Sequence, residues 1–205
     1  MNKFIEPMIF DIKELEKKAG ESGLSCYILA RSYDSQENGV EQSFEKAVYW
    51  YKRGVELKDP RCIYGLGACY YFGDGIEKNL KKAYELFVLA YPLLLEQIAR
   101  EQSNHKVQSF SKFCLGAYYY FGFGDIQKDD NKAFQLIYEC AMQGHLAAIY
   151  DLGANFYYNG IGTERDLNLS KYYLELASSV RLPRAMKKLE EYKETYKKMK
   201  QKRVI

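Results

Sequence analysis

The chain has 205 residues, of which 47% are hydrophobic and 28% are charged, and its formal net charge is +3. This balance is typical of a globular protein. No run approaches 18 consecutive apolar residues, which excludes a membrane-spanning helix.

The first twenty residues do not have the pattern of a secretory signal. They include Glu6 and Asp11, and they lack the apolar run of about 7 to 15 residues that such a signal needs. We therefore expect a protein of the cytoplasm.

From about residue 22 onward the chain repeats itself. A Leu-Gly pair begins at Leu66, Leu115 and Leu152, a weaker copy begins at Leu29, and a further step reaches Leu189. These leucines are 37, 49, 37 and 37 residues apart, so five segments share one frame. Glycines follow the leucines, and then a small residue: Ala47, Ala83, Ala133 and Ser170. Repetition at this period indicates a repeat architecture.

Each repeat is predicted to consist of two helices joined by a glycine turn. Leu66, Tyr70 and Gly73 show the i, i+4, i+7 spacing of a first helix. The segment after the turn, for example residues 80–91, carries an apolar stripe between charges, as an amphipathic second helix does. Gly75 and Gly124 stand where the chain must turn, so we expect both to adopt positive φ.

The pattern A-x-x-x-L-G-x-x-Y-x-x-G-x-G-[VI]-x-x-[DN]-x-x-K-A resembles the Sel-1-like repeat family, which is related to the tetratricopeptide repeat. Residues 62–87 match it most fully, and several copies lie in register over residues 22–183. The resemblance implies an all-α superhelical solenoid of about four helix-turn-helix repeats. The first unit lacks one turn glycine and the fourth has Ser170 in place of alanine, which is usual for end units.

The resemblance also implies unit boundaries within one repeat domain that spans residues 1–205. The expected units are about 22–60, 61–108 with an insertion, 109–145 and 146–183, followed by a capping helix at about 184–200. The insertion lies at residues 91–109, where the spacing rises to 49. Its leucines and Ile98 predict a prolonged or broken helix, and "EQSNHK" predicts a polar loop.

The C-terminal segment is expected to form the capping helix. Ala185, Leu189, Tyr192, Tyr196 and Met199 recur at steps of four and three, which places them on one helix face. The other face carries a basic run: Lys187, Lys188, Lys193, Lys197, Lys198, Lys200, Lys202 and Arg203. It is interpreted as the solvated face of a cap, with contact to nucleic acid or an acidic membrane as the alternative.

The cysteines indicate free thiols. Some relatives of the family are secreted and hold a disulfide in each repeat, which requires cysteines at the same two positions of every unit. The five cysteines of this chain fall at scattered positions: Cys26, Cys62, Cys69, Cys114 and Cys140. We expect them to be buried and reduced.

No motif for catalysis or for a cofactor is found. The Gly-x-Gly pairs follow a helix, whereas a nucleotide-binding loop needs a strand before it. Cys140, His145 and His105 lack the spacing of a zinc site. Asp125, Asp129 and Asp130 lack the spacing of a calcium loop and are interpreted as turn and N-cap residues. No serine elbow or cysteine-histidine motif is present. We therefore predict a protein that is not an enzyme and that binds no cofactor or metal.

The remaining candidates lie on the inner wall that the resemblance implies. In related repeats the positions −2, +2 and +5 from the repeat leucine line the concave wall. The positions at +2 are Arg31 and then Ala68, Ala117 and Ala154, a row of alanines. The predicted partner-binding residues are Tyr27, Arg31, Tyr64, Tyr71, Phe113, Tyr120, Tyr150 and Tyr157. The aromatics at −2 could instead belong to the core between repeats, while Tyr71, Tyr120 and Tyr157 at +5 are expected to form an exposed ladder.

The function predicted from these features is a protein-interaction adaptor that binds a peptide or partner protein in its concave groove. One alternative is a groove that binds a small ligand, such as a cell-wall fragment, with an associated catalytic role. The other is a basic tail that binds nucleic acid. The partner and the oligomeric state are not specified by the pattern.

Overall fold

The computed structural model describes residues 5–202, and every regular element within that range is helical. The prediction of an all-α fold is therefore confirmed. The elements are α1 (Ile12–Lys18), α2 (Gly23–Ser35), the short 3-10 turn η1 (Glu37–Gly39), α3 (Phe44–Glu56), α4 (Pro60–Phe72), α5 (Leu80–Arg100), α6 (His105–Phe121), α7 (Asp130–Met142), α8 (Leu146–Asp151), the π turn η2 (Leu152–Phe156), α9 (Tyr157–Asn159), α10 (Leu167–Ser179) and α11 (Pro183–Lys202).

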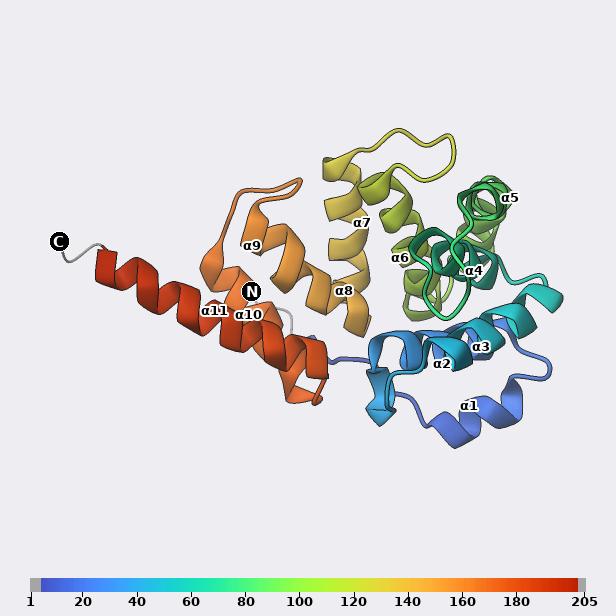
Figure 1. Ribbon diagram of the computed structural model, residues 1–205, viewed down its shortest axis with the longest axis horizontal. Coiled ribbons are helices and arrows are strands. Elements are labelled where there is room, and N and C mark those ends of the chain that lie inside the picture. Colours follow the sequence, from blue (N-terminus) through green and yellow to red (C-terminus); the bar gives the residue numbers. More distant parts are fainter. Residues whose placement is uncertain (1–4, 203–205) are drawn as a thin grey trace.

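The helices pair in chain order, and the pairs stack on one another (Figure 1). α2 packs on α3, α4 on α5 and α6 on α7, while the broken helix formed by α8, η2 and α9 packs on α10. α11 follows as an unpaired helix against α10, and its last turns extend past the other helices. The arrangement is a curved array whose first helices line the inner side.

One hydrogen bond recurs at the turn of every pair. The backbone N–H of the residue that caps each second helix donates to the carbonyl of an aromatic residue near the end of the first helix. These bonds measure 2.9 to 3.0 Å and join Ser43 to Tyr33, Asn79 to Tyr70, Asp129 to Tyr119 and Asp166 to Tyr157. The capping side chains also accept backbone N–H groups of the second helix, as N-cap residues commonly do. The bond therefore identifies equivalent residues in successive units.

The turn glycines have the predicted backbone conformation. Gly75 has φ of 68° and Gly124 has φ of 61°, both in the left-handed region. Their surroundings differ, because a Cβ on Gly75 would lie 2.4 Å from the carbonyl oxygen of Phe44, whereas on Gly124 it would meet no atom closer than 3.6 Å. The absence of a side chain at Gly75 thus also allows the turn of the second unit to approach α3, the second helix of the first unit.

The insertion prolongs two neighbouring helices. α5 has 21 residues where α3, α7 and α10 have 13, and α6 has 17 where α4 has 13. These eight and four residues account for the twelve by which the spacing of 49 exceeds 37. Of the two predicted forms, the prolonged helix is correct, and residues 101–104 form the polar loop.

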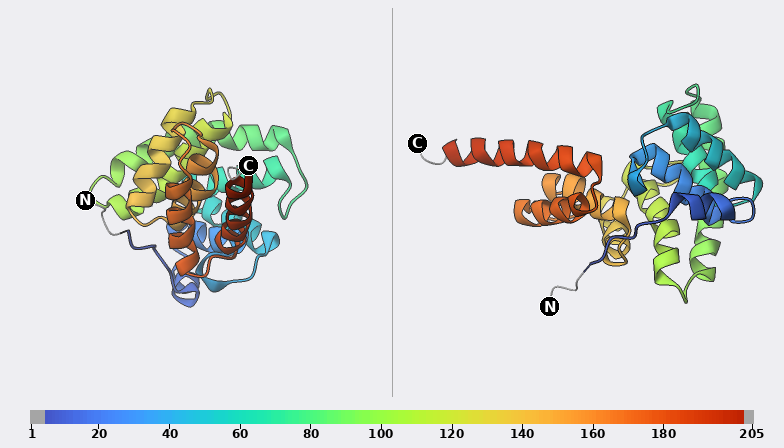
Figure 2. Two further views of the ribbon diagram at one scale, coloured as in Figure 1. Left: turned by 90° about the vertical axis from the view of Figure 1, so that its left-hand side faces the viewer. Right: turned by 90° about the horizontal axis from the view of Figure 1, so that it is seen from below.

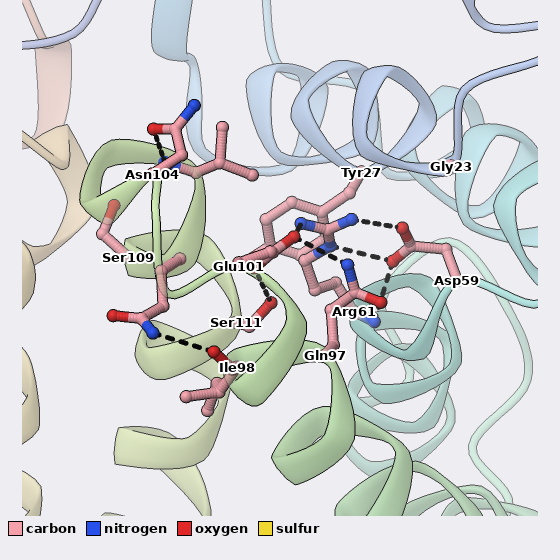
Figure 3. A network of polar contacts seen from close by, with 12 residues as sticks. Gly23, Tyr27, Asp59, Arg61, Gln97, Ile98, Glu101, Asn104, Ser109 and Ser111 are labelled. Carbon is pink, nitrogen blue, oxygen red and sulfur yellow. Dashed lines mark hydrogen bonds and ion pairs between the residues drawn. The ribbon is translucent and has the colours of Figure 1, made fainter.

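A buried ionic network attaches this insertion to the body (Figure 3). The Arg61 side chain, 4% exposed, donates from Nε to Asp59 at 3.0 Å and from Nη1 to Glu101 at 2.9 Å. Gln97 and Ser111 donate to the two oxygens of Glu101 at 2.8 and 3.0 Å. Because every charged group in the network has partners, burial of the ions is compensated.

The two ends of the array are tied together. The backbone N–H of Met8 donates to the carbonyl of Gly144 at 2.7 Å, so the segment before α1 crosses to the third and fourth units. Figure 2 shows this segment leaving α1 and passing beside α8. At the other end, Arg184 at the start of α11 donates to Glu37 in the first unit at 3.2 Å. The concave side is therefore held in one curvature.

The predicted apolar stripe of α11 is confirmed in its first part. Ala185 and Tyr192 are buried, and Leu189 packs with Tyr192 against α9 and α10. The side chains of Tyr196 and Met199, and those of the basic residues from Lys197 onward, lie outside the part that the structure describes. The five cysteines are all buried and free, as predicted.

Replacing the two turn glycines should separate conformational strain from close approach. Gly124→Ala should lower the free energy of unfolding by about 1 kcal/mol, because alanine resists positive φ. Gly75→Ala should lower it by about 3 kcal/mol, because its Cβ also collides with the backbone of Phe44. Urea unfolding measures both values, and equal losses would show that the contact with Phe44 is unimportant.

Removing Arg61 should destabilise the protein strongly. Arg61→Leu leaves Asp59 and Glu101 without their buried cation, so we expect a loss of about 3 kcal/mol in urea unfolding. The matched control is Arg53→Leu, which removes an exposed pair with Glu56 and should change the value by less than about 0.5 kcal/mol. Similar losses in both variants would contradict a special role for the network.

Candidate partner-binding groove

Two adjoining cavities lie on the inner side of the first helices. The larger, of about 270 Å³, is lined by α2, α4, α6, the fourth unit and the start of α11. The smaller, of about 100 Å³, lies between α6, α7 and the fourth unit. Phe113, Ala117, Phe121 and Asp151 line both cavities. The two cavities therefore form one groove, in which Ala68 and Ala117 supply small side chains.

The structure brings some of the predicted wall residues together at this groove. Arg31, Tyr64 and Phe113 line the larger cavity, and Tyr120 lines the smaller one. Tyr71 lines neither cavity; it is 38% exposed, and its ring lies 5.1 Å from that of the buried Phe123. Arg31, Ala68 and Ala117 all occupy the +2 position, so the wall position implied by the resemblance holds for the first three units.

The other predicted wall residues lie elsewhere. Tyr27 is only 1% exposed and packs in the core against Phe110 and Tyr51. Tyr150 lies beneath Arg184, whose guanidinium carbon is 4.4 Å from the ring centroid. Tyr157 is 8% exposed and stacks on Tyr173 at 5.6 Å. The expectation that Tyr157 is an exposed rung of the ladder is therefore wrong.

The reason is one extra residue in the fourth unit. Gly160 lies eight positions after Leu152, whereas Gly73 lies seven positions after Leu66 and Gly122 seven positions after Leu115. The extra residue is accommodated by the π turn Leu152–Phe156, in which the backbone bonds close over five residues. Beyond this turn, a residue of the fourth unit is therefore equivalent to the residue that lies one position nearer to the leucine in the other units.

Two other contacts confirm the corrected equivalence. The carbonyl of Tyr157 accepts the turn hydrogen bond that Tyr70 and Tyr119 accept in their units, and the side chains of these two pack against the core. In addition, a cation lies over the following ring in each unit: Lys78 over Tyr71, Lys128 over Tyr120 and Arg165 over Tyr158, at 5.8 to 5.9 Å. The residue equivalent to Tyr71 and Tyr120 is Tyr158.

Among the groove residues that the sequence reasoning missed, two are exposed aromatic residues. Phe72 and Phe121, the last residues of α4 and α6, line the larger cavity with 48% and 47% of their surfaces exposed. Their ring centroids are 5.8 Å apart. Both residues directly precede the first turn glycine, which is the signal that could have identified them. Exposed aromatic rings of this kind commonly become anchors at interfaces.

The end of the larger cavity is charged. Glu37 accepts from Arg31 at 3.1 Å and from Arg184 at 3.2 Å, and Arg31 also donates to Asp34 at 3.2 Å. Burial opposes the charge of Arg31 and lowers its pKa, but Glu37 and the neighbouring Tyr27, Tyr51 and Asp34 together more than offset this, so the pKa of Arg31 is raised. Burial raises the pKa of Asp151, and the nearby Arg184 and Arg31 partly counteract this.

Comparison with known proteins agrees with the repeating architecture. The model of the Sel1 repeat matches four segments of the chain, residues 23–59, 60–91, 113–145 and 146–179. The chain belongs to the Sel1 repeat family. The four matched segments correspond in order to the four helix pairs, and the third begins after the insertion.

Several Sel1 repeat proteins are similar to the chain at low identity. A curated Sel1-like repeat-containing protein of Schizosaccharomyces pombe, described as uncharacterized, is 26% identical over 165 residues, which are 76% of this chain and 22% of that protein. The chain thus spans about a fifth of this relative.

Solved structures of Sel1 repeat proteins are also similar. One from Oxalobacter formigenes has 22% identity and a TM-score of 0.45 over 88% of this chain and 74% of its own. One described as a putative Sel1 repeat protein from Klebsiella pneumoniae has 16% identity and the same TM-score over 89% and 83%.

His145 connects the wall of this Sel1 repeat groove with its charged end. It caps α8 by accepting the N–H of Ala148 at its Nδ1, stacks on Phe113 at 4.5 Å and is 3% exposed. Burial, together with the charges of Arg31 and Arg184, which act in the same direction, lowers its pKa to about 3. The imidazole is therefore neutral at ordinary pH and serves as a packed cap.

Other kinds of site find little support in the described part of the chain. Within residues 5–202 no group of three or more His, Cys, Asp and Glu side chains is placed to hold a metal ion. None of the helices described there has both the length and the apolar character required to cross a bilayer.

Neutral His145 predicts a pH-dependent stability. The unfolded chain binds a proton near pH 6.5 and the folded chain only near pH 3. This contribution is thus fully present above pH 6.5 and is lost as the pH falls toward 3. Between pH 7.5 and 5.0 the wild type should lose about 2 kcal/mol more unfolding free energy than His145→Asn, since asparagine can retain the cap without titrating.

The exposed His105→Asn variant is the control and should follow the wild type in the same urea titrations. If His145→Asn has the same pH dependence as the wild type, the buried imidazole does not account for the effect.

Proposed function

We propose that the chain is a non-enzymatic interaction module that binds an extended segment of a partner protein in the groove formed by both cavities. Repeats of this family generally mediate protein–protein interaction. The observation that carries the proposal is the continuous groove itself, with Ala68 and Ala117 between the exposed rings of Phe72 and Phe121 and the wall residues Tyr64 and Phe113.

The shape of the groove favours an extended chain. Alanine at the +2 position of two successive first helices leaves room for a backbone, and the aromatic residues on either side can contact its side chains. Neighbouring helices pack about 8 to 10 Å apart, and an extended chain advances about 3.3 Å per residue. Each unit would therefore contact about three residues of the bound segment.

A catalytic role is less well supported by the residues that line the groove. Its one cysteine, Cys69, is a poor nucleophile because burial, and then the charges of Asp34 and Asp74, raise its pKa to about 12. The thiol consequently stays protonated at ordinary pH. No histidine lines either of the two cavities, so no imidazole there can act as a base.

A pair of arginine substitutions tests where the partner binds. Ala117→Arg places a long side chain in both cavities, while Ala99→Arg places the same side chain on the exposed surface of the insertion. Partners captured from a lysate of the source organism, and quantified by mass spectrometry, should fall at least about tenfold with Ala117→Arg because several aromatic anchors are blocked together. They should be unchanged with Ala99→Arg.

Thermal unfolding of the two variants controls for folding, since Ala117 is partly exposed and can accept a larger side chain outward. The reverse result, capture lost with Ala99→Arg and kept with Ala117→Arg, would place the binding surface on the insertion at residues 91–109 and would contradict the groove proposal.

A further inference from the structure

The charges that line the larger cavity are unbalanced. Three carboxylates, Asp34, Asp74 and Asp151, face two guanidinium groups, Arg31 and Arg184. Both guanidinium groups are also bonded to a further carboxylate, Glu37, which lies behind them. Four carboxylates thus share two cations, and this end of the groove is negative although the whole chain is +3.

Asp74 is the carboxylate least compensated by the protein. Asp34 is paired with Arg31, and Asp151 accepts from Asn155 at 3.1 Å. Within residues 5–202, by contrast, no ion pair or side-chain hydrogen bond is formed by the Asp74 carboxylate. Desolvation and then the charge of Asp34 raise the pKa of Asp74, which indicates that the two carboxylates repel each other across the cavity.

Aromatic rings stand beside these carboxylates. Phe72 and Tyr64 line the same cavity as Asp34 and Asp74. A carboxylate pair next to aromatic faces is the combination that stabilises a lysine or arginine side chain, through ion pairing at its head and cation–π contact along its length. The smaller cavity differs, since Tyr120, Phe121, Ile137 and Phe156 make it mainly apolar.

We infer that the partner segment carries a lysine or arginine that binds between Asp34 and Asp74, and an apolar side chain about six residues away that enters the smaller cavity. This inference rests on the proposed function and specifies its ligand. The cation site lies between the first and second units and the smaller cavity lies between the third and fourth. The two sites are therefore two helix separations apart, about 20 Å, which an extended chain spans in about six residues.

Selection from a phage-displayed random peptide library on the full chain tests the inference. Peptides retained by the wild type should be enriched in Lys or Arg, with Leu, Ile, Met or Phe about six positions away. A selected peptide, made with a fluorophore, is then titrated by fluorescence anisotropy. Asp74→Asn should raise its Kd about fivefold, as expected for loss of a partly exposed ion pair.

Glu77→Gln is the matched control, because it removes the same charge from the same loop at an exposed position that lines neither cavity. It should change Kd by less than about twofold. Replacing the peptide cation with glutamine should weaken binding to the wild type and not weaken binding to Asp74→Asn further, since the pair is already lost.

Ala117→Arg distinguishes the two ways of failing. The inference is overturned if the peptides bind more weakly to Ala117→Arg but lack a cation or are enriched in Asp and Glu. The groove proposal is then left intact. The inference and the groove proposal are both overturned if the selected peptides have the same Kd for Ala117→Arg and the wild type. The same holds if the library yields no peptide that depends on the groove.

Discussion

The hydrogen bond from the N-cap of each second helix to an aromatic carbonyl of the first is the constraint on which the array depends. It recurs in all four units at 2.9 to 3.0 Å, from Ser43, Asn79, Asp129 and Asp166. Because the same residue also caps the second helix, a single position fixes where one helix ends and the next begins. The glycines with positive φ allow this closure in a short loop. Equivalent residues of successive units therefore face the same side, which is the condition for a groove.

The sequence sufficed for the helix pairs because the repeat pattern encodes this local geometry. The positive φ of Gly75 and Gly124 and the buried face in the first part of α11 follow from spacing and residue type. For the insertion the sequence left a prolonged or a broken helix open, and the structure shows the prolonged one. The wall of the fourth unit could not be predicted by counting from its leucine. The additional residue before Gly160 is visible in the sequence, but only the structure shows that it is absorbed as a π turn within the helix and not in the loop. For this reason Tyr158 takes the place predicted for Tyr157.

The charged end of the groove could not be predicted either, because its residues are far apart in the sequence. Glu37 and Arg184 meet only because the array curves until its last helix reaches the first unit. Once there, Arg184 and Arg31 share one carboxylate, and the segment before α1 adds a backbone bond from Met8 to Gly144. These contacts hold the curvature from both ends. A groove held in this way loses less conformational freedom when a partner binds, which favours affinity.

The contrast between the groove and the whole chain has a consequence for recognition. A partner approaching from beyond the Debye length, about 8 to 10 Å at physiological salt, experiences a protein of slightly positive charge. A cationic segment is then not steered toward the groove from a distance, so long-range attraction contributes little to its rate of association. It meets the carboxylates of Asp34 and Asp74 only after it has entered the cavity beside Phe72. Selectivity for a cation therefore arises from short-range contacts, in a place where the carboxylates already repel each other.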